Sequence, residues 1–473
     1  MSTKGRATKA LRRIDHLHRN GFSFGDVNGL VGRIGSLVEW PTSFAANWPG
    51  PAFDVYSQAG SYSASLSAKD YANESPAKTY YVAPWGSTGN SGLTHLLPKA
   101  NISQVISALG TQPTAGVRIL LAAGFYSDPG NNVVLTVPVD VICPSGRAVI
   151  ASNGVSGLSA TADSGIYKWT SVTNLAGIVD WRFLSAWGRP FRLTAAGSLA
   201  ACQSTAGTYY NDGADTYVNL LDGRVPDSSV VGYDHVGTRV LRWQKGGYIQ
   251  NCDFHGFANS ITMTQASPYA STDSVALCNV RLVSSGSVAY NGLYAAMDRG
   301  VVVIENSATY YCGKDGWNFT QSDSYVNACA VLINSIAEWS GVDYVGSGGG
   351  ALNANTQHYG WQTVDVGGAN IYAGNRVIAD INTAKRWMIG AEIGWAAGNG
   401  TDWSTQGNTA FALSDTAQIW LDDCRLSMGS DSLAANTYQI YWVDPTATLR
   451  YRNMSVSGWR QAAATTNGTL EAY

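Results

Sequence analysis

Three acidic side chains in the second half of the chain have types and spacing that suit acid–base chemistry. Asp315 and Asp343 lie nine positions after Asn306 and Asn334, and Glu338 ends an apolar stretch between them. If the two asparagines are equivalent positions of repeats stacked about 4.8 Å apart, the two aspartates are near neighbours. Carboxyl groups about 5 to 10 Å apart suit hydrolysis of a glycosidic bond, with one as general acid and one as nucleophile or base. We expect Glu338 as the acid and Asp315 or Asp343 as its partner.

Each of these carboxyl groups also has a structural interpretation. Asp315 and Asp343 lie close to glycines in turns, where an aspartate often accepts hydrogen bonds from local backbone N–H groups. Glu338 is compatible with a solvated position on an outer face. The same alignment of repeats places Tyr310 next to Glu338.

Aromatic residues near these positions favour a carbohydrate ligand, because the apolar C–H faces of sugar rings stack on indole and phenol rings. His358 is a candidate proton carrier, and Lys314 a candidate contact for an anionic group. For each aromatic residue, packing in the core or at a rim is the alternative. The residues expected to bind substrate are Trp317, Trp339, Tyr344, His358, Trp361 and Trp395.

A repeated pattern has to position these residues. An alternating apolar stretch followed by Asn or Asp recurs along the second half of the chain, and the first spacings are 28, 27 and 28 residues. A constant period of this length is typical of a solenoid, whose coils must stack to bury their apolar faces. The copies are centred on Asn251, Asn279, Asn306, Asn334, Asp423 and Asn453, with a weaker copy at Asp380.

The repeated asparagines are expected to form one column, in which amide side chains hydrogen-bond from coil to coil. The longer gaps on either side of Asp380 predict inserted loops or an unrecognised turn. A β-sandwich or jelly roll is the alternative fold, since its strands also alternate.

Composition supports an all-β protein. Charged residues are 13% of the 473, whereas glycine (52), tyrosine (25) and tryptophan (16) are abundant. The net charge of −3 does not favour nucleic-acid binding, and the longest apolar runs are too short to insert into a membrane. The seven cysteines form no C-x-x-C pair, so buried free thiols are expected. The scattered histidines predict no metal site, and we expect no cofactor.

Residues 1–75 differ from the rest. The first twenty residues hold six Lys or Arg against one Asp, a pattern that suits a solvated helix, a transit peptide or a nucleic-acid arm. No apolar segment typical of a signal peptide follows Met1. The Ser/Ala-rich stretch before residue 75 resembles a linker or thin stalk. Residues 76–460 are expected to form the solenoid, with a capping helix near 101–109 and a C-terminal tail over 461–473.

Several motifs resemble those of pectate-lyase-like right-handed β-helix proteins. They are "TYYVAPWGSTGNSG" at Thr79, "GVRILLAAGFY" at Gly116, "YYCGKDGWNF" at Tyr310 and a stretch near 207–227 that is similar to a β-hairpin insert. The resemblance covers about residues 79–460 and implies a right-handed, single-stranded parallel β-helix with a small N-terminal region. It implies action on polysaccharide, but the calcium-binding aspartates and catalytic arginine of pectate lyases are not matched.

Within that group the chain looks most like a phage tailspike, because an unrelated N-terminal region and a stalk-like stretch precede the solenoid. This implies a homotrimer in the virion that contacts other tail proteins through its N-terminal region and acts at the host cell surface. The expected activity is depolymerisation of a bacterial capsule, exopolysaccharide or lipopolysaccharide, by hydrolysis rather than elimination. The alternative is a virion protein that binds the glycan, or has a structural role, without cleaving it.

Overall fold

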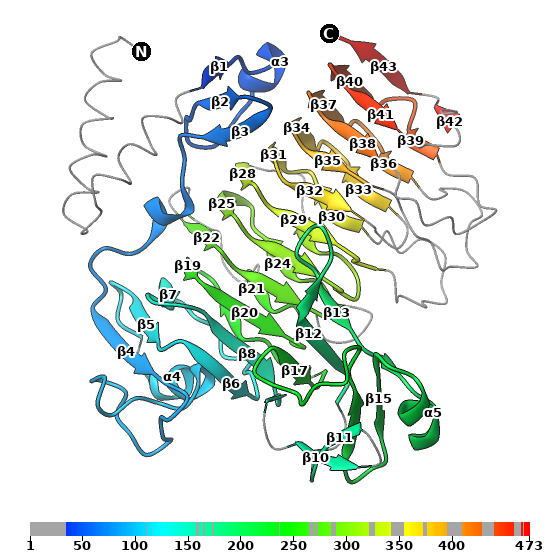
Figure 1. The fold of residues 1–473 in the computed structure, drawn as a ribbon. Coiled ribbons are helices and arrows are strands. Elements are labelled where there is room, and N and C mark those ends of the chain that lie inside the picture. Colours follow the sequence, from blue (N-terminus) through cyan, green and yellow to red (C-terminus); the bar gives the residue numbers. More distant parts are fainter. Residues whose placement is uncertain are drawn as a thin grey trace.

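The computed structural model describes residues 35–110, 112–157, 160–163, 166–172, 175–235, 237–263, 270, 273–284, 290–320, 327–341, 354–371, 376–394, 409–427, 439–457, 465–466 and 468–473. Three long sheets run along one axis and form the body of the molecule (Figure 1). In this part of the chain, no helix is long and apolar enough to span a bilayer.

The three sheets are parallel, and between residues 246 and 466 each successive coil adds one strand to each of them. The 12-stranded sheet contains β4 (Lys78–Val82), β5 (Val117–Leu121), β7 (Val139–Ile142), β19 (Gly246–Gln250), β22 (Ser274–Cys278), β25 (Arg299–Glu305), β28 (Asn327–Ile333), β31 (Gln362–Val366), β34 (Lys385–Ile389), β37 (Gln418–Asp422), β40 (Thr448–Arg452) and β43 (Thr469–Ala472). The 10-stranded sheet contains β6 (Gly124–Asp128), β8 (Ala148–Ser152), β20 (Cys252–His255), β23 (Arg281–Val283), β26 (Ala308–Tyr310), β29 (Ile336–Glu338), β32 (Ala369–Ile371), β35 (Glu392–Ile393), β38 (Arg425–Ser427) and β41 (Ser455–Ser457). The 9-stranded sheet contains β18 (Leu241–Trp243), β21 (Ile261–Met263), β24 (Leu293–Ala296), β27 (Trp317–Thr320), β30 (Ala354–Tyr359), β33 (Arg376–Ile381), β36 (Thr409–Leu413), β39 (Gln439–Val443) and β42 (Thr465–Thr466).

This arrangement is a right-handed parallel β-helix, and the predicted fold class is confirmed. The solenoid begins at β4, two residues after the predicted boundary at 76. The described residues of the predicted C-terminal tail do not leave the stack, because β42 and β43 pair with β39 and β40.

The predicted asparagine column is confirmed. Asn251, Asn279, Asn306 and Asn334 each follow the aligned ends of neighbouring strands in the 12-stranded sheet. All four have a positive φ of 49 to 57°, a conformation that asparagine tolerates better than most residues. The Asn279 amide donates to Asn251 Oδ1 over 2.6 Å. Local backbone geometry therefore explains why this residue type recurs at the turn.

Asp380 was wrongly placed in this column. It lies in β33 of the 9-stranded sheet, between His358 and Leu413 of the adjacent strands. The column continues instead through Gly367 and Gly390, which have φ values of 65 and 63° and precede Asp423. The turns were unrecognised because glycine reaches the same conformation without a side chain.

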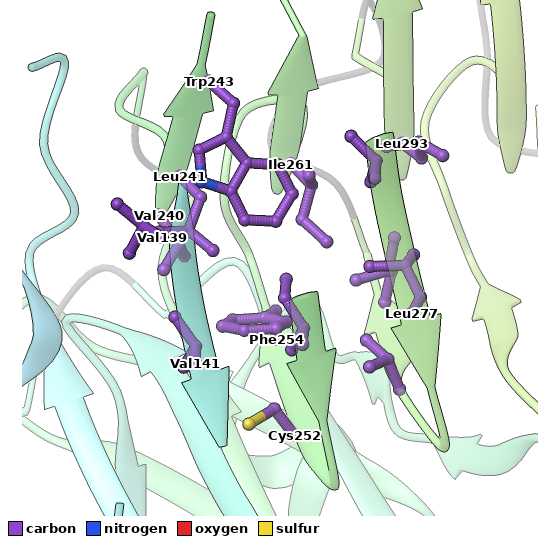
Figure 2. Packing of buried hydrophobic residues seen from close by; sticks show 14 of the residues in the cluster. Val139, Val141, Val240, Leu241, Trp243, Cys252, Phe254, Ile261, Leu277 and Leu293 are labelled. Atoms are coloured by element: carbon purple, nitrogen blue, oxygen red, sulfur yellow. The ribbon is translucent and has the colours of Figure 1, made fainter. Parts of the chain in front are cut away.

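The interior of the first coils is apolar (Figure 2). Trp243, Phe254 and Leu277 are buried there and come from one strand of each sheet. Helix α4 (Ile102–Ala108) closes the N-terminal end of this core with Ile102, Val105 and Ile106, and Asn101 caps it by accepting from Gln104 N–H. The expected capping helix is therefore present.

A large insert interrupts the stack between β8 and β18. An antiparallel hairpin, β15 and β16, occupies the region where a hairpin was expected, within a longer insertion. Its elements are β9 (Val155–Ser156), β10 (Ala160–Asp163), β11 (Ile166–Trp169), β12 (Gly177–Leu184), β13 (Pro190–Arg192), β14 (Thr194–Ala195), α5 (Leu199–Ser204), β15 (Thr208–Asn211), β16 (Thr216–Asn219) and β17 (Val230–Tyr233).

The described part of the N-terminal region, residues 35–75, packs along the solenoid rather than extending from it as a stalk. In Figure 1 its first elements lie beside β31, β34 and β37, and the chain then runs down to β4. Apolar residues such as Phe44 and Val55, which the Ser/Ala-rich composition obscured, are fully buried. The elements are β1 (Ser36–Val38), α3 (Thr42–Ala45), β2 (Val55–Gln58), β3 (Ser61–Ala64) and the 3₁₀ helix η1 (Ala68–Tyr71).

The seven cysteines are all buried and free, as expected. They behave as small apolar side chains of the coils.

Candidate functional site

Two of the three outer faces of the solenoid are covered. The insert packs on the 10-stranded sheet through a cluster that includes Val179, Tyr233 and Tyr310. The N-terminal segment packs on the 12-stranded sheet through Phe44 and Ala68. Among the described residues, no hydrophobic cluster joins the outer row of the 9-stranded sheet to either segment. The outer face of the 9-stranded sheet is therefore the candidate binding face.

Alternation along the strands places one row of mainly polar side chains on this face. Strand residues on either side of each row member, such as Trp317 and Phe319 around Asn318, point into the core. Arg242, Tyr294 and Gln357 are half-buried, whereas Thr262 and Asn318 are largely covered. The row, in coil order, is Arg242, Thr262, Tyr294, Asn318 and Gln357.

Asp315 lies three residues before Asn318, at the edge of the same sheet. It belongs to a second column of equivalent positions. At each of these positions a side-chain oxygen accepts a hydrogen bond from a backbone N–H of the next coil. Asn259 Oδ1 accepts from Asn291 N–H over 2.6 Å, and Asn291 Oδ1 accepts from Asp315 N–H over 3.2 Å. Asp315 Oδ1 then accepts from Ala354 N–H over 2.8 Å. Asp315 thus links two coils, whereas the structural alternative from the sequence was a hydrogen bond to local backbone.

The second carboxylate oxygen of Asp315 faces the outer row. Asn318 donates to Oδ2 over 2.6 Å, and Lys314 Nζ lies 4.0 Å from it. Asn318 also donates to Gln357 Oε1 over 3.0 Å, which joins two coils of the row. Burial raises the pKa of Asp315 to about 6, against the lowering effects of Lys314 and these hydrogen bonds. The group thus holds a proton at weakly acidic pH.

Arg376 occupies the same column two coils beyond Asp315, with Ala354 between them. It is buried, and burial lowers the pKa of this guanidinium to about 10, with Asp315 acting in the opposite direction. The pair was not recognisable from the sequence, because the positions of this column are not separated by a constant number of residues.

The predicted stacking of Asp315 on Asp343 does not follow from the register. Pairing of Trp317 with Thr356 places Ala354, not Asp343, next to Asp315. Equal distances of nine residues from Asn306 and Asn334 do not give equivalent positions here, because the segment between β29 and β30 is longer than the one between β26 and β27. Asp343 itself lies outside the described residues.

Glu338 lies on the outer face of the 10-stranded sheet, directly next to Tyr310 as expected. It is buried under the insert, where Arg189 Nε donates to Oε1 and Ser185 donates to Oε2, each over 2.8 Å. The Arg189 guanidinium lies over the Trp339 ring at 4.5 Å. Since both carboxylate oxygens accept from the insert, this geometry is an anchor for the turn between β12 and β13.

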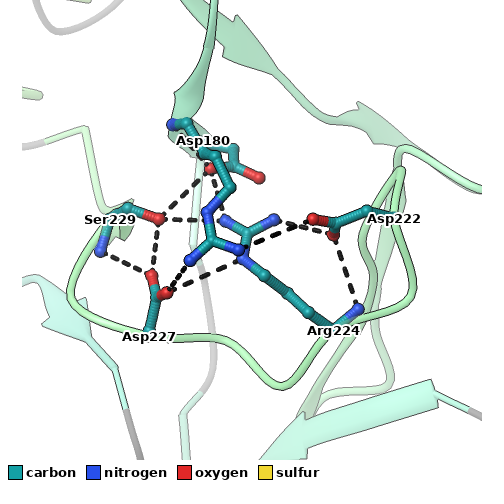
Figure 3. Close-up of polar contacts among 6 residues, drawn as sticks. Asp180, Asp222, Arg224, Asp227 and Ser229 are labelled. Atoms are coloured by element: carbon teal, nitrogen blue, oxygen red, sulfur yellow. Dashed lines mark hydrogen bonds and ion pairs between the residues drawn. The ribbon is translucent and has the colours of Figure 1, made fainter.

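The insert holds a second charged network, far from these residues in the sequence (Figure 3). Arg224 pairs with Asp180 at 2.6 Å and with Asp222 at 2.7 Å, and Ser229 donates to Asp227 over 2.5 Å. Arginines and backbone N–H groups neutralise these carboxylates, so the network holds the loop after β16 against β12. Across the described residues, no group of three or more His, Cys, Asp or Glu is arranged to hold a metal ion.

The other predicted residues divide into two groups. Trp317 and Trp361 lie in the apolar core, and His358 lies in the interior beside Arg386, so the structure favours the core-packing alternative for them. Tyr344 and Trp395 lie outside the described residues.

None of the five residues of the outer row was predicted from the sequence. Strand alternation around the buried Trp317 and Phe319 is the signal that would have identified Asn318.

Comparisons with known proteins give fold-level similarity. No family model matches the chain, and no curated protein matches it. Among solved structures, one described as a glycoside hydrolase is 10% identical over 84% of this chain and 96% of its own, with a TM-score of 0.41. Pectate lyase Pel9A is 14% identical over 85% and 80%, with a TM-score of 0.38.

The tailspike Gp54 of the Acinetobacter baumannii bacteriophage AP22, solved with A. baumannii capsular saccharide, is 8% identical over 80% of this chain and 77% of its own, with a TM-score of 0.17. Similarities of this size assign no activity. The β-helix is established by the strand pairing itself.

Proposed function

We propose that this protein is a phage tailspike that recognises and cleaves a bacterial surface polysaccharide along the outer face of the 9-stranded sheet. The row from Arg242 to Gln357 supports this proposal, because it offers hydrogen-bonding groups and one phenol ring at the spacing of successive coils. Coils repeat at about 4.8 Å, which is close to the rise per sugar residue in an extended glycan. An extended glycan that lies along the solenoid axis would therefore place about one sugar residue beside each side chain of the row.

The observation that carries the catalytic part is the Asp315 carboxyl group. Burial raises its pKa to about 6, so it can donate a proton to a leaving oxygen at weakly acidic to neutral pH. Lys314 and Asn318 border the same oxygen and suit contacts to a polar or anionic substituent. Hydrolysis also needs a second carboxylate, for which Asp343 stays the proposed partner.

Glu338 is a weaker candidate for the acid than the sequence suggested. It lies on the face that the insert covers, where Arg189 and Ser185 occupy both of its oxygens, whereas Asp315 lies at the edge of the uncovered sheet. It is better suited to holding the insert in place.

The direct test is incubation of the purified protein with capsule, exopolysaccharide and lipopolysaccharide from host strains. New reducing ends indicate hydrolysis, whereas unsaturated products that absorb in the ultraviolet indicate elimination. Asp315→Asn keeps the shape of the side chain but removes the proton donor, so oligosaccharide release should fall roughly 100-fold or more. Glu74→Gln, at an exposed position of the N-terminal segment, is the matched control and should leave release unchanged.

Equal release by Asp315→Asn and the parent protein would overturn the assignment to Asp315. If Asp343→Asn or Glu338→Gln alone abolishes release while the melting temperature is unchanged, that residue replaces Asp315 as the candidate acid.

A second candidate function is glycan binding without cleavage. Its support is that Asp315 is fully buried and that Ala354 and Asn318 already occupy its two oxygens. On this alternative no product forms, but Tyr294→Ala and Gln357→Ala still weaken glycan binding by about tenfold each. Binding unaffected by both changes would exclude this face.

The virion location, the contact of residues 1–75 with other tail proteins and the homotrimer are parts of the same proposal. Light scattering tests the trimer, since one chain has a mass of 50.2 kDa. A monomer at micromolar concentration would favour a cellular or secreted enzyme.

A further inference from the structure

A layer of polar side chains crosses the interior of the solenoid over two successive coils. In the neighbouring coils, apolar residues occupy the equivalent inward positions of the strands. Thr363 and Arg386 follow Ala330 and precede Ile419 in one inward row of the 12-stranded sheet, and Asp365 follows Leu332 in another. His358 and Asp380 follow Phe319 in an inward row of the 9-stranded sheet.

Arg386 is at the centre of this layer. Its guanidinium lies 3.3 Å from Asp365 and 2.9 Å from Asp380. Arg386 and Thr363 both donate to His358 Nδ1, at 2.8 and 2.9 Å, so this nitrogen carries no proton and its 3.4 Å approach to Asp380 is no ion pair. One cation thus faces two carboxyl groups, with little or no exposure to solvent.

The polar layer separates two apolar cores. The first core runs from the capping helix to Trp361, and the second begins at Val377 and extends to Leu449. In a solenoid each coil is stabilised mainly by its neighbours, so a layer without apolar contacts weakens the connection between the coils on either side. The interior alone therefore couples the two cores poorly.

The N-terminal segment bridges the same level from outside. Phe44 packs with Trp387 and Trp420, and its cluster also contains Val331 and Val364, so it covers coils on both sides of the polar layer. Tyr62 donates to Asp423 Oδ2 over 2.6 Å, across 361 positions of the sequence.

The other end of the segment is fastened to the first coils. Ser67 and Ala68 donate to Glu305 over 2.6 and 2.8 Å, and Asn73 N–H donates to Asp140 over 2.8 Å. One stretch of chain thus connects the start of the solenoid with its C-terminal coils.

We infer that residues 36–73 form a strap that holds the C-terminal coils, from β33 onward, onto the rest of the solenoid across the polar layer, and that these coils open as a separate unit when the strap is displaced. The inference does not depend on the proposed function.

Gly390 offers a way to displace the strap without touching either core. It lies in the asparagine column, and a Cβ at this position would lie 1.9 Å from the Tyr62 ring. Gly390→Asn introduces the residue type that the column uses elsewhere, so backbone strain stays small while the new side chain pushes Tyr62 away.

The matched control is Gly367→Asn, one coil earlier. Its Cβ meets only the Asn334 side chain at 2.7 Å and stays 3.9 Å from the backbone of Tyr62. A second variant, Tyr62→Ala with Gly390→Asn, removes the ring and tests whether the effect is due to the clash or to loss of the strap.

Hydrogen exchange of the full-length protein, measured strand by strand, is the readout. Gly390→Asn should speed exchange in β34, β37 and β40 by about tenfold or more and leave β19, β22 and β25 unchanged, because only the strapped unit opens. Gly367→Asn should change neither group by more than about threefold. The double variant should exchange as fast as Gly390→Asn, since the strap stays undocked.

Equal acceleration in both groups of strands would show that the solenoid opens as one unit and would overturn the inference. So would unchanged exchange in Gly390→Asn, because displacement of Tyr62 would then release nothing. Should Gly390→Asn fail to fold, Tyr62→Phe removes only the bond to Asp423, and faster exchange confined to β34, β37 and β40 is again required.

Discussion

The two parts of the solenoid interior share one backbone and differ in chemistry. Around Trp243 and Phe254 the interior is apolar, whereas around Arg386 it is ionic, yet the strands pair in parallel through both regions without a break. Backbone hydrogen bonds between coils are thus sufficient for the register, and the side chains inside decide how strongly each coil adheres to the next. A buried ion pair is costly to desolvate and is weak evidence of stability.

The largest effect should come from breaking the ionic layer. Arg386→Met leaves Asp365 and Asp380 buried without a cation, which should lower the free energy of unfolding by about 3 to 5 kcal/mol at neutral pH. Urea denaturation at pH 7.5 measures the loss. Acid should reduce it, because protonation removes the unpaired charges.

The control for this variant replaces the whole layer by apolar residues, with Asp365→Leu, Arg386→Met and Asp380→Leu together. Such replacements are often neutral or stabilising. A triple variant as unstable as Arg386→Met would show that the charges themselves are not the cause of the loss.

The apolar region supplies the contrasting prediction. Leu277→Ala removes a fully buried side chain and should lower the free energy of unfolding by about 3 kcal/mol. No titrating group contributes, so the loss should be the same at pH 5 and pH 8 in paired urea titrations. A loss that varies with pH as it does in Arg386→Met would remove the distinction between the two regions.

Asp365→Asn should show an intermediate, pH-dependent effect. Burial raises the pKa of Asp365 to about 6, so the folded protein binds this proton more tightly than the unfolded chain does. The contribution to stability is present below the ordinary pKa of an aspartate and is lost as the pH rises through about 6. The variant should therefore gain about 1 to 3 kcal/mol relative to the parent protein between pH 4 and pH 7.5.

That gain is measured by subtracting the unfolding free energy of the parent protein from that of Asp365→Asn at each pH. His358 has the opposite pH dependence, but it is present in both proteins and its contribution cancels in the difference. Burial lowers the pKa of His358, so its contribution is lost as the pH falls below the ordinary histidine range. A constant difference between the two proteins would mean that Asp365 does not titrate in this window.

The smallest effects belong to the asparagine column, which both regions share. Asn306 has a φ of 49°, so Asn306→Ala should cost about 1 kcal/mol, and Asn306→Gly only a few tenths. Thermal unfolding of the two variants separates backbone conformation from side-chain contacts. A larger loss in the glycine variant would show that the amide contacts between coils matter more than φ.

The fold was predictable because its signals are local. The period of the asparagines reflects a left-handed turn that each coil repeats, and the capping helix is defined by Asn101 and the apolar residues directly after it. Buried free thiols followed from cysteine spacing and composition alone.

The candidate site was predictable only in part. Asp315 was found from its offset within the coil, and the contact of Tyr310 with Glu338 from the alignment of two repeats. The equal offset of Asp315 and Asp343 does not hold because one turn is longer, and Trp317 and Trp361 point inward rather than outward. Burial depends on which face of a strand meets the core, and a change of one residue in register reverses that face.

What the sequence by itself determined is therefore the repeating unit, the residue type at its tight turn and the class of fold. Only the tertiary structure decided which outer faces are covered, that Glu338 is held by Arg189, and that Tyr62 reaches Asp423. The physical reason is distance along the chain. Turn conformation and strand alternation depend on neighbouring residues, whereas the strap and the polar layer depend on side chains that meet only after the coils have stacked.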